Sequence, residues 1–98
     1  KIQSLGFVKD IIDLEPIVDK FLAFNWEVHR IDGHNYSELI NTFSEIKNKR
    51  TKPTVVIADT IKGKGVDFME NKLLWHYKSP DVSEYDNARD QINNYKSF

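Results

Sequence analysis

The three histidines are the side chains of this sequence best suited to proton transfer near neutral pH, because an imidazole can both give and take a proton there. His76 lies in a long loop that follows the apolar run ending at Ala58. Open parallel α/β sheets bind ligands at the carboxyl ends of such strands, which favours a functional role for His76. Many lone loop histidines are solvated or structural, so its position alone leaves that alternative open.

The other two histidines have simpler structural explanations. His29 alternates with Glu27 and Ile31 on one face of a predicted strand, which favours packing over catalysis. His34 follows the pair Asp32-Gly33, whose turn chemistry requires no ligand. We therefore do not place either histidine among the catalytic candidates.

Two basic segments could suggest binding of phosphate or a polyanion. The Gly63-Lys64-Gly65 loop lacks the Gly-x-x-x-x-Gly-Lys-Ser/Thr pattern and does not directly open a convincing helix. We interpret the two glycines as residues that allow the loop to turn, and a direct contact of this loop with a ligand stays open. The second segment is typical of a solvated helix C-terminus and comprises Lys47, Lys49, Arg50 and Lys52.

The first predicted elements are a helix and a strand. Residues 17–25 carry apolar side chains at helical spacing, with Pro16 in the first turn, where a missing N–H costs nothing. Residues 26–31 are aromatic and β-branched over the length of a strand. The Asp-Gly pair that follows is expected to end this strand.

A second helix and a second strand come next. Asn35 with Glu38 three residues later resembles a capping box, which predicts a helix start. The pair Lys52-Pro53 breaks this helix. Residues 54–58 form a continuous, mostly β-branched apolar run, the pattern of a parallel strand covered on both faces.

Ser83 is expected to cap a last helix, whose apolar residues recur at three- and four-residue intervals up to Tyr95. The predicted order is therefore helix, strand, helix, strand, loop, helix. Alternating helices and strands imply right-handed crossovers, and hence an α/β fold with a partial parallel sheet and flanking helices. Two strands leave both sheet edges open, so we expect further strands from residues outside this sequence.

The composition indicates a folded protein without a strong electrostatic preference. Of 98 residues, 40% are hydrophobic and 30% are charged, which excludes a disordered chain. Fourteen basic residues against fifteen acidic ones favour neither nucleic acid nor an anionic membrane as a partner. The chain contains no cysteine, no membrane-length apolar run and no signal-peptide pattern at its start, so we expect a cytoplasmic protein.

Several motifs, in this order and spacing, resemble the N-terminal half of transketolases, particularly those whose two halves are separate subunits. The resemblance is colinear from Lys1 to about Pro80. The motifs are Ile31-Asp32-Gly33-His34, Lys52-Pro53-Thr54, Thr60-Ile61-Lys62-Gly63-Lys64-Gly65-Val66, Phe68-Met69-Glu70-Asn71 and Trp75-His76. The resemblance implies that residues 1–98 are the C-terminal portion of a thiamine-diphosphate-binding domain whose upstream half, with its Gly-Asp-Gly signature and following Asn, is absent.

The resemblance also implies an activity and a set of partners. Transketolases transfer a two-carbon ketol unit from a ketose donor to an aldose acceptor, and thiamine diphosphate supplies the carbanion chemistry. A divalent cation, Mg²⁺ or Ca²⁺, ties the diphosphate to protein oxygens. The second, pyrimidine-binding half is expected as a fused domain or a separate subunit, in a dimer or larger assembly. The fragment alone is expected to be inactive.

Site residues follow from the same resemblance. By position, the backbone carbonyl of Ile2 is expected to bind the cation, and His76 is expected to contact the diphosphate and transfer protons at the sugar hydroxyls. Many transketolases have glycine after this histidine, whereas Tyr77 stands here and bears on sugar specificity.

Other functions stay open on the sequence. A relative such as a deoxyxylulose-phosphate-synthase-like or dehydrogenase-type enzyme would share the same domain. A non-catalytic α/β partner-binding module would keep the motifs without the chemistry. A subunit-interface scaffold would use Trp26, Trp75 and Tyr77 as exposed aromatics buried against another chain.

Overall fold

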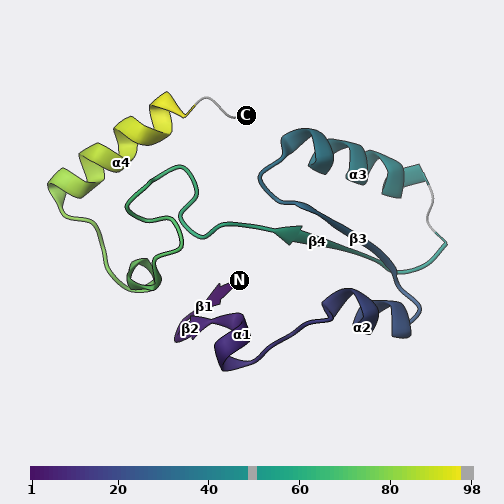
Figure 1. Ribbon diagram of the computed structural model, residues 1–98. Coiled ribbons are helices and arrows are strands. Elements are labelled where there is room, and N and C mark those ends of the chain that lie inside the picture. Colours follow the sequence, from purple (N-terminus) through teal and green to yellow (C-terminus); the bar gives the residue numbers. More distant parts are fainter. Residues whose placement is uncertain (49–50, 96–98) are drawn as a thin grey trace. The chain divides into compact units, whose positions relative to one another are not determined.

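A computed structural model describes residues 1–48 and 51–95 of the chain (Figure 1). The fold divides into two units. One consists of residues 13–60, and the other joins residues 1–12 to the described residues from 61 onward. Arg50 and Lys49 of the predicted basic cluster lie outside the described residues, whereas Lys47 and Lys52 are exposed, as expected of a solvated face.

The unit formed by residues 13–60 contains a two-stranded parallel sheet between two helices. Strands β3 (Glu27–Asp32) and β4 (Thr54–Asp59) pair in parallel over their full length. Figure 1 shows α2 (Ile17–Ala23) on one side of this pair and α3 (Tyr36–Asn48) on the other. This arrangement confirms the predicted α/β class, the parallel pairing and the flanking helices.

The boundaries of α2 follow from local chemistry. Pro16 is the N-cap residue, so its missing N–H lies among the helix N–H groups that have no partner within the helix. The chain leaves the helix through Asn25, which adopts a positive φ of 63°. The ring of Phe21 then packs against Trp26 with centroids 5.4 Å apart. Trp26 is consequently half-buried within this unit, and its prediction as an exposed aromatic is wrong.

The start of α3 confirms half of the predicted capping box. The Asn35 side-chain oxygen accepts from the Glu38 N–H at 3.2 Å. The Glu38 carboxylate accepts from the Asp32 N–H at 2.8 Å instead of closing back on Asn35. Glu38 therefore joins the helix start to the last residue of β3, which fixes the turn between them.

The other unit begins with elements that the sequence did not predict. Strands β1 (Ile2–Gln3) and β2 (Gly6–Phe7) form a short antiparallel hairpin, followed by the single-turn helix α1 (Val8–Ile11). After the loop that follows β4, this unit continues with the 3₁₀ turn η1 (Leu73–His76) and ends in α4 (Val82–Asn94). Elements of two to four residues carry too little periodicity to be read from sequence.

Helix α4 is capped by Asp81, so the prediction that Ser83 caps it is wrong. The Asp81 carboxylate accepts from the Glu84 N–H at 2.8 Å, and the Glu84 carboxylate accepts from the Asp81 N–H at 3.0 Å. Ser83 lies at the second helical position, inside the first turn. Asp81 has Glu84 three positions later to complete the reciprocal pair, whereas the residue three positions after Ser83 is Asp86, whose side chain is shorter than the Glu or Gln of a capping box.

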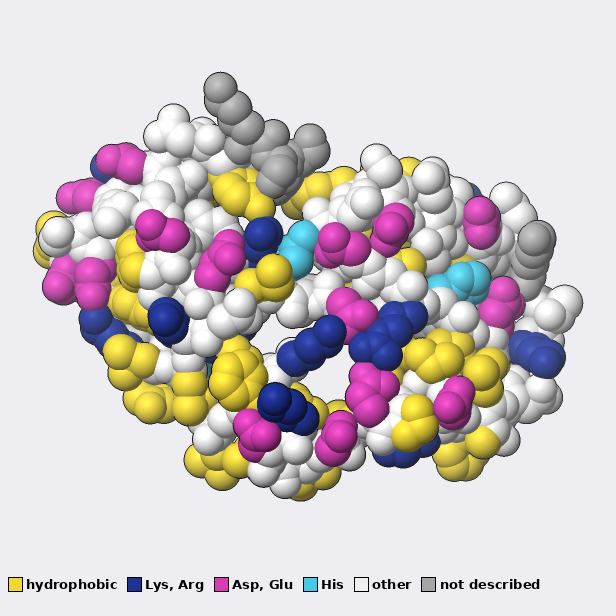
Figure 2. Space-filling view, viewed as in Figure 1, with side chains coloured by type: hydrophobic (Ala, Val, Ile, Leu, Met, Phe, Trp, Pro, Cys, Tyr) yellow, Lys and Arg dark blue, Asp and Glu magenta, His cyan; other side chains and the backbone are white. Residues whose placement is uncertain are grey.

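Little of the described chain is fully buried. Val66, at 4% exposure, is the buried hydrophobic residue among the described ones. Residues 54–57 of β4 are only half-buried and Ala58 is exposed, so the described residues cover this strand only in part. Figure 2 shows hydrophobic side chains at several places on the surface of the molecule. That further strands from outside this sequence cover β4 stays a prediction.

Candidate functional site

His76 is the last residue of η1, and its side chain is exposed. Its ring stands at 88° to the ring of Tyr77, with centroids 6.3 Å apart. Tyr77 is itself 69% exposed. An exposed imidazole next to a phenol is accessible to a ligand, and the residues around η1 determine how well it is held.

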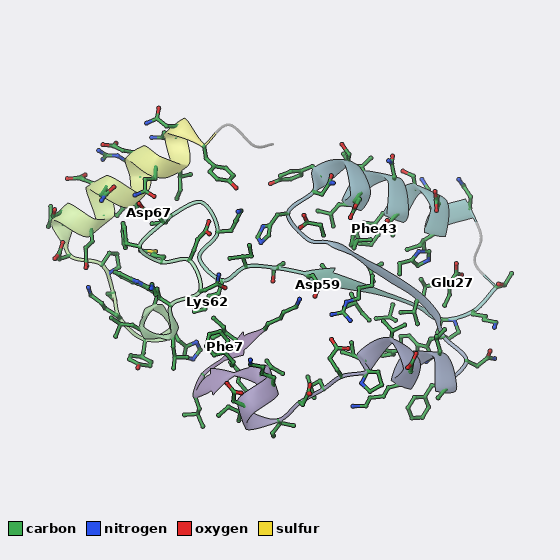
Figure 3. The ribbon with its side chains drawn as sticks, viewed as in Figure 1. Phe7, Glu27, Phe43, Asp59, Lys62 and Asp67 are labelled. Atoms are coloured by element: carbon green, nitrogen blue, oxygen red, sulfur yellow. The ribbon has the colours of Figure 1, made fainter. Side chains whose placement is uncertain are left out.

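Trp75 anchors the residue before His76 to the preceding loop. The indole N–H of Trp75 donates to the Phe68 carbonyl at 3.0 Å, and the two rings pack with centroids 5.4 Å apart. The Trp75 carbonyl accepts from the ammonium of Lys62 at 3.4 Å. Figure 3 labels Lys62 in the loop that follows β4. Trp75 is therefore half-buried within this unit rather than exposed as predicted.

The segment after His76 is tied to α4. The N–H groups of Tyr77 and Lys78 donate to the Leu74 carbonyl at 3.3 and 3.0 Å, which closes the turn. The Lys78 ammonium lies 4.5 Å from the centroid of the Trp75 ring and pairs with the Glu84 carboxylate. The hydrogen bond that Lys78 donates to the Glu84 carboxylate lowers the pKa of Glu84. Both sides of His76 are thus connected to ordered structure.

The Gly63-Lys64-Gly65 loop is a folded turn whose lysine is engaged within the chain. Both glycines have positive φ, and a Cβ at Gly63 would lie 2.6 Å from the Met69 carbonyl oxygen. The Lys64 ammonium lies 3.7 Å from the Glu70 carboxylate. The pKa of Lys64 is raised, first by its hydrogen bond with Tyr95 and then by Glu70. These contacts support loop geometry over a phosphate site.

An open groove of about 500 Å³ lies between η1, the preceding loop and α4. Its wall is formed by the packed rings of Phe68 and Trp75 together with Leu74, and Lys72 is among the charged side chains that also line it. His76 is not one of its lining residues. The groove is therefore a separate feature from the imidazole.

The backbone of Ile2 presents its carbonyl away from the hairpin. The Val8 N–H donates to the Lys1 carbonyl at 3.0 Å, which makes Lys1 and Val8 a hydrogen-bonded pair. Such pairs alternate in an antiparallel ladder, so Ile2 and its partner Phe7 form a non-hydrogen-bonded pair. The Ile2 carbonyl thus points away from β2, as a backbone ligand to a hard cation requires.

A complete metal site is not formed by the described residues. No group of three or more carboxylate or imidazole side chains that could hold a metal ion occurs among residues 1–48 and 51–95. The Ile2 carbonyl can therefore supply one oxygen ligand, and the remaining ligands would have to come from other residues. Ile2 fits a shared cation site and cannot form one by itself.

The structure separates the three histidines. Ile2 and His76 belong to the same unit, whereas His29 and His34 belong to the other. His29 lies 3.2 Å from the Glu27 carboxylate on the same face of β3, which confirms the predicted alternation. The backbone N–H of His34 donates to the Asp32 carboxylate at 2.9 Å, which confirms the predicted turn.

Sequence reasoning missed Lys62 and Phe68 as the residues that hold Trp75. Lys62 is 13 residues from Trp75 and Phe68 is seven, and no motif links these positions. Their contacts depend on the path of the loop between them.

Within the described residues, no helix is long and apolar enough to cross a membrane.

Comparison with known proteins identifies the family. Residues 2–97 match the family described as transketolase, thiamine diphosphate binding domain. The chain is 43% identical over 76 residues to the 6-deoxy-6-sulfo-D-fructose transketolase subunit of Clostridium sp. (strain MSTE9), covering 78% of this chain and 28% of that protein. It is 38% identical over 92 residues to an apulose-4-phosphate transketolase subunit of Actinobacillus succinogenes, covering 94% and 33%.

A solved structure agrees in fold. The crystal structure of transketolase from Campylobacter jejuni matches with a TM-score of 0.77 and 31% identity, over 94% of this chain and 14% of that one. The chain thus spans about a third or less of the proteins that it matches. With the predicted resemblance confirmed over residues 2–97, the chain belongs to the transketolase family and lies within its thiamine diphosphate binding domain.

Proposed function

We propose that this chain is part of an enzyme that transfers a two-carbon ketol unit from a ketose to an aldose. The observation that carries the proposal is the family match over residues 2–97, which includes both predicted site residues. The exposed imidazole of His76, held from both sides by the contacts of Trp75 and Lys78, supports it.

Thiamine diphosphate would supply the carbanion chemistry when bound. The Ile2 carbonyl would supply one oxygen ligand to a divalent cation, Mg²⁺ or Ca²⁺, whose charge would offset that of the diphosphate. His76 donates to the diphosphate and moves protons at the hydroxyl groups of the bound sugar. An imidazole suits this task because both of its protonation states are populated near neutral pH.

The names of the relatives support a class of substrate for this chain. The two relatives named above are named for a sulfo-sugar and a sugar phosphate, and both are transketolase subunits. We therefore extend to this chain a ketose donor and an aldose acceptor as substrates. Tyr77, exposed beside His76, is positioned to limit which sugars reach the imidazole.

The complete enzyme needs a partner half. Both relatives are named as subunits, which supports a pyrimidine-binding half on a separate chain, while a fused half would serve equally. Cofactor sites commonly lie where domains or subunits meet, so the active form is a dimer or a larger assembly. We place it in the cytoplasm, where sugar phosphates are available.

The test is reconstitution of the full-length protein with its pyrimidine-binding half. Two-carbon transfer between a panel of ketoses and aldoses should require thiamine diphosphate. Chelation should abolish it, and Mg²⁺ or Ca²⁺ should restore it. The matched control is the full-length protein without its partner half, which should be inactive. A folded, reconstituted assembly that binds thiamine diphosphate but transfers no two-carbon unit would contradict the proposal.

A further inference from the structure

Lys62 is a half-buried cation whose ammonium contacts a peptide group. It donates to the Trp75 carbonyl at 3.4 Å. Within residues 1–48 and 51–95, no carboxylate lies at ion-pair distance from it. A lysine that orders its long side chain for a carbonyl loses rotamer freedom, which needs a compensating gain.

Lys64, two residues later in the same loop, has different partners. Its ammonium faces the Glu70 carboxylate and the ring of Tyr95. The hydrogen bond to the Trp75 carbonyl comes from Lys62 instead. Substituting each lysine in turn therefore distinguishes the loss of a positive charge in this loop from the loss of the contact with Trp75.

The backbone of Lys62 provides a fixed base for this contact. Its carbonyl accepts from the Asn71 N–H at 2.9 Å, which closes the loop on itself. The Val66 N–H donates to the Gly63 carbonyl at 3.2 Å, and Val66 is the buried residue of the loop. The side chain of Lys62 thus extends from an ordered turn.

The Trp75 carbonyl belongs to the same planar peptide unit as the N–H of His76. A donor that holds this oxygen fixes the orientation of the plane, and with it the Cα of His76. On the side-chain end of Trp75, the Phe68 carbonyl holds the indole N–H. We propose that Lys62 is a positioning residue for His76, acting through the Trp75–His76 peptide. This inference rests on the role proposed for His76.

The test uses the complete, reconstituted enzyme with Lys62→Met, which removes the donor and keeps an unbranched side chain that is one atom shorter. The turnover number should fall about 10-fold to 100-fold, the cost of a small misplacement of a reacting group, while KM changes little. Lys64→Met is the matched control and should keep the wild-type rate. Lys62→Arg retains a donor and should recover part of the loss.

A double-mutant cycle separates positioning from a general structural effect. In a His76→Ala background, Lys62→Met should cause little further loss, because a residue that acts through His76 has nothing left to position. The thermal midpoint should be close to that of the wild type in each variant. A crystal structure of the Lys62→Met variant should show the Trp75 carbonyl and the His76 ring displaced or in several conformers.

The inference is overturned if Lys62→Met behaves like Lys64→Met, or if it slows the His76→Ala enzyme as much as the wild type. It is also overturned if His76 keeps its position in the variant crystal structure. Failure of the proposed function would look different, because the wild-type assembly would then transfer no two-carbon unit. In that event the variant crystal structure still decides whether Lys62 positions His76.

Discussion

Arg30 and Asp59 form a two-point contact between neighbouring parallel strands. Two guanidinium nitrogens of Arg30, Nε and Nη2, donate to the two carboxylate oxygens of Asp59 at 2.8 and 3.1 Å. The same guanidinium donates to both oxygens of Glu15 at 3.2 and 2.8 Å. Arg30 thereby links β3, the end of β4, where Figure 3 labels Asp59, and the segment before α2.

Replacing Arg30 with Met should lower the thermal midpoint of the complete protein, because it removes the guanidinium that donates to the carboxylates of both Glu15 and Asp59. Arg30→Lys keeps the charge but cannot supply the two-point geometry, so it should recover only part of the loss. Differential scanning calorimetry measures both variants. Equal midpoints for wild type and Arg30→Met would show that the contact contributes nothing to stability.

The contribution of Glu15 should depend on pH in a defined direction. Its hydrogen bond from Arg30 is the main cause that lowers the pKa of Glu15 below its ordinary value of about 4.5. A group with a lowered folded-state pKa contributes stability above its unfolded pKa and loses it as pH falls through the folded value. The difference in midpoint between wild type and Arg30→Met should therefore narrow below about pH 4.5. A difference that grows with acid would contradict this sign.

His76→Ala in the complete enzyme should lower turnover by about two to four orders of magnitude, the usual range for a general acid or base. Folding should be nearly unchanged because the side chain is exposed. His34→Ala is the control, since His34 lies in the other unit. Steady-state kinetics and thermal midpoints must be measured together. If His34→Ala is equally slow at unchanged stability, the assignment of His76 is wrong.

Tyr77 should affect the choice of sugar more than the chemical step. Tyr77 is 69% exposed, and its ring stands edge-on to that of His76. Tyr77→Gly should change the ratio of kcat/KM values among ketose donors by about 10-fold, within the range that one pocket contact supplies. Tyr77→Phe keeps the ring and should keep the ratio if bulk is the cause. A wild-type profile for Tyr77→Gly would remove Tyr77 from the specificity determinants.

The 98-residue chain alone should bind neither thiamine diphosphate nor Mg²⁺ with a Kd tighter than about 1 mM. A cation of this kind needs about six oxygen ligands, and Ile2 supplies one carbonyl. Isothermal titration calorimetry of the isolated chain gives the answer. A micromolar dissociation constant for either ligand would contradict this prediction, because it would require a nearly complete binding site within this chain.

Asp81→Ala should destabilise α4 by about 1 kcal/mol, the usual loss for an N-cap side chain. Ser83→Ala should have an effect of less than about 0.5 kcal/mol, because Ser83 lies within the first turn and is exposed. Hydrogen exchange of the α4 amides in the complete protein compares the two variants. Equal protection loss in both would contradict the assignment of Asp81 as the cap.

The sequence by itself determined the class of fold and the family of this protein. The apolar, β-branched run at residues 54–58 predicted a parallel strand, and the turn after residue 31 predicted where its partner ends. These are local patterns, in which neighbouring residues dictate backbone geometry. The resemblance over ordered motifs likewise required only their order and spacing, and it selected His76 and Ile2 as site residues.

The tertiary structure alone decided which groups hold those residues. Lys62 donates to Trp75 across 13 residues, and Phe68 accepts from the same tryptophan. The two carboxylates that meet at Arg30 come from segments 15 and 29 residues away. Contacts of this kind depend on the path of the chain through loops, where side-chain periodicity is lost. The physical reason is that a hydrogen bond requires two atoms at one point in space, and sequence order does not specify that point.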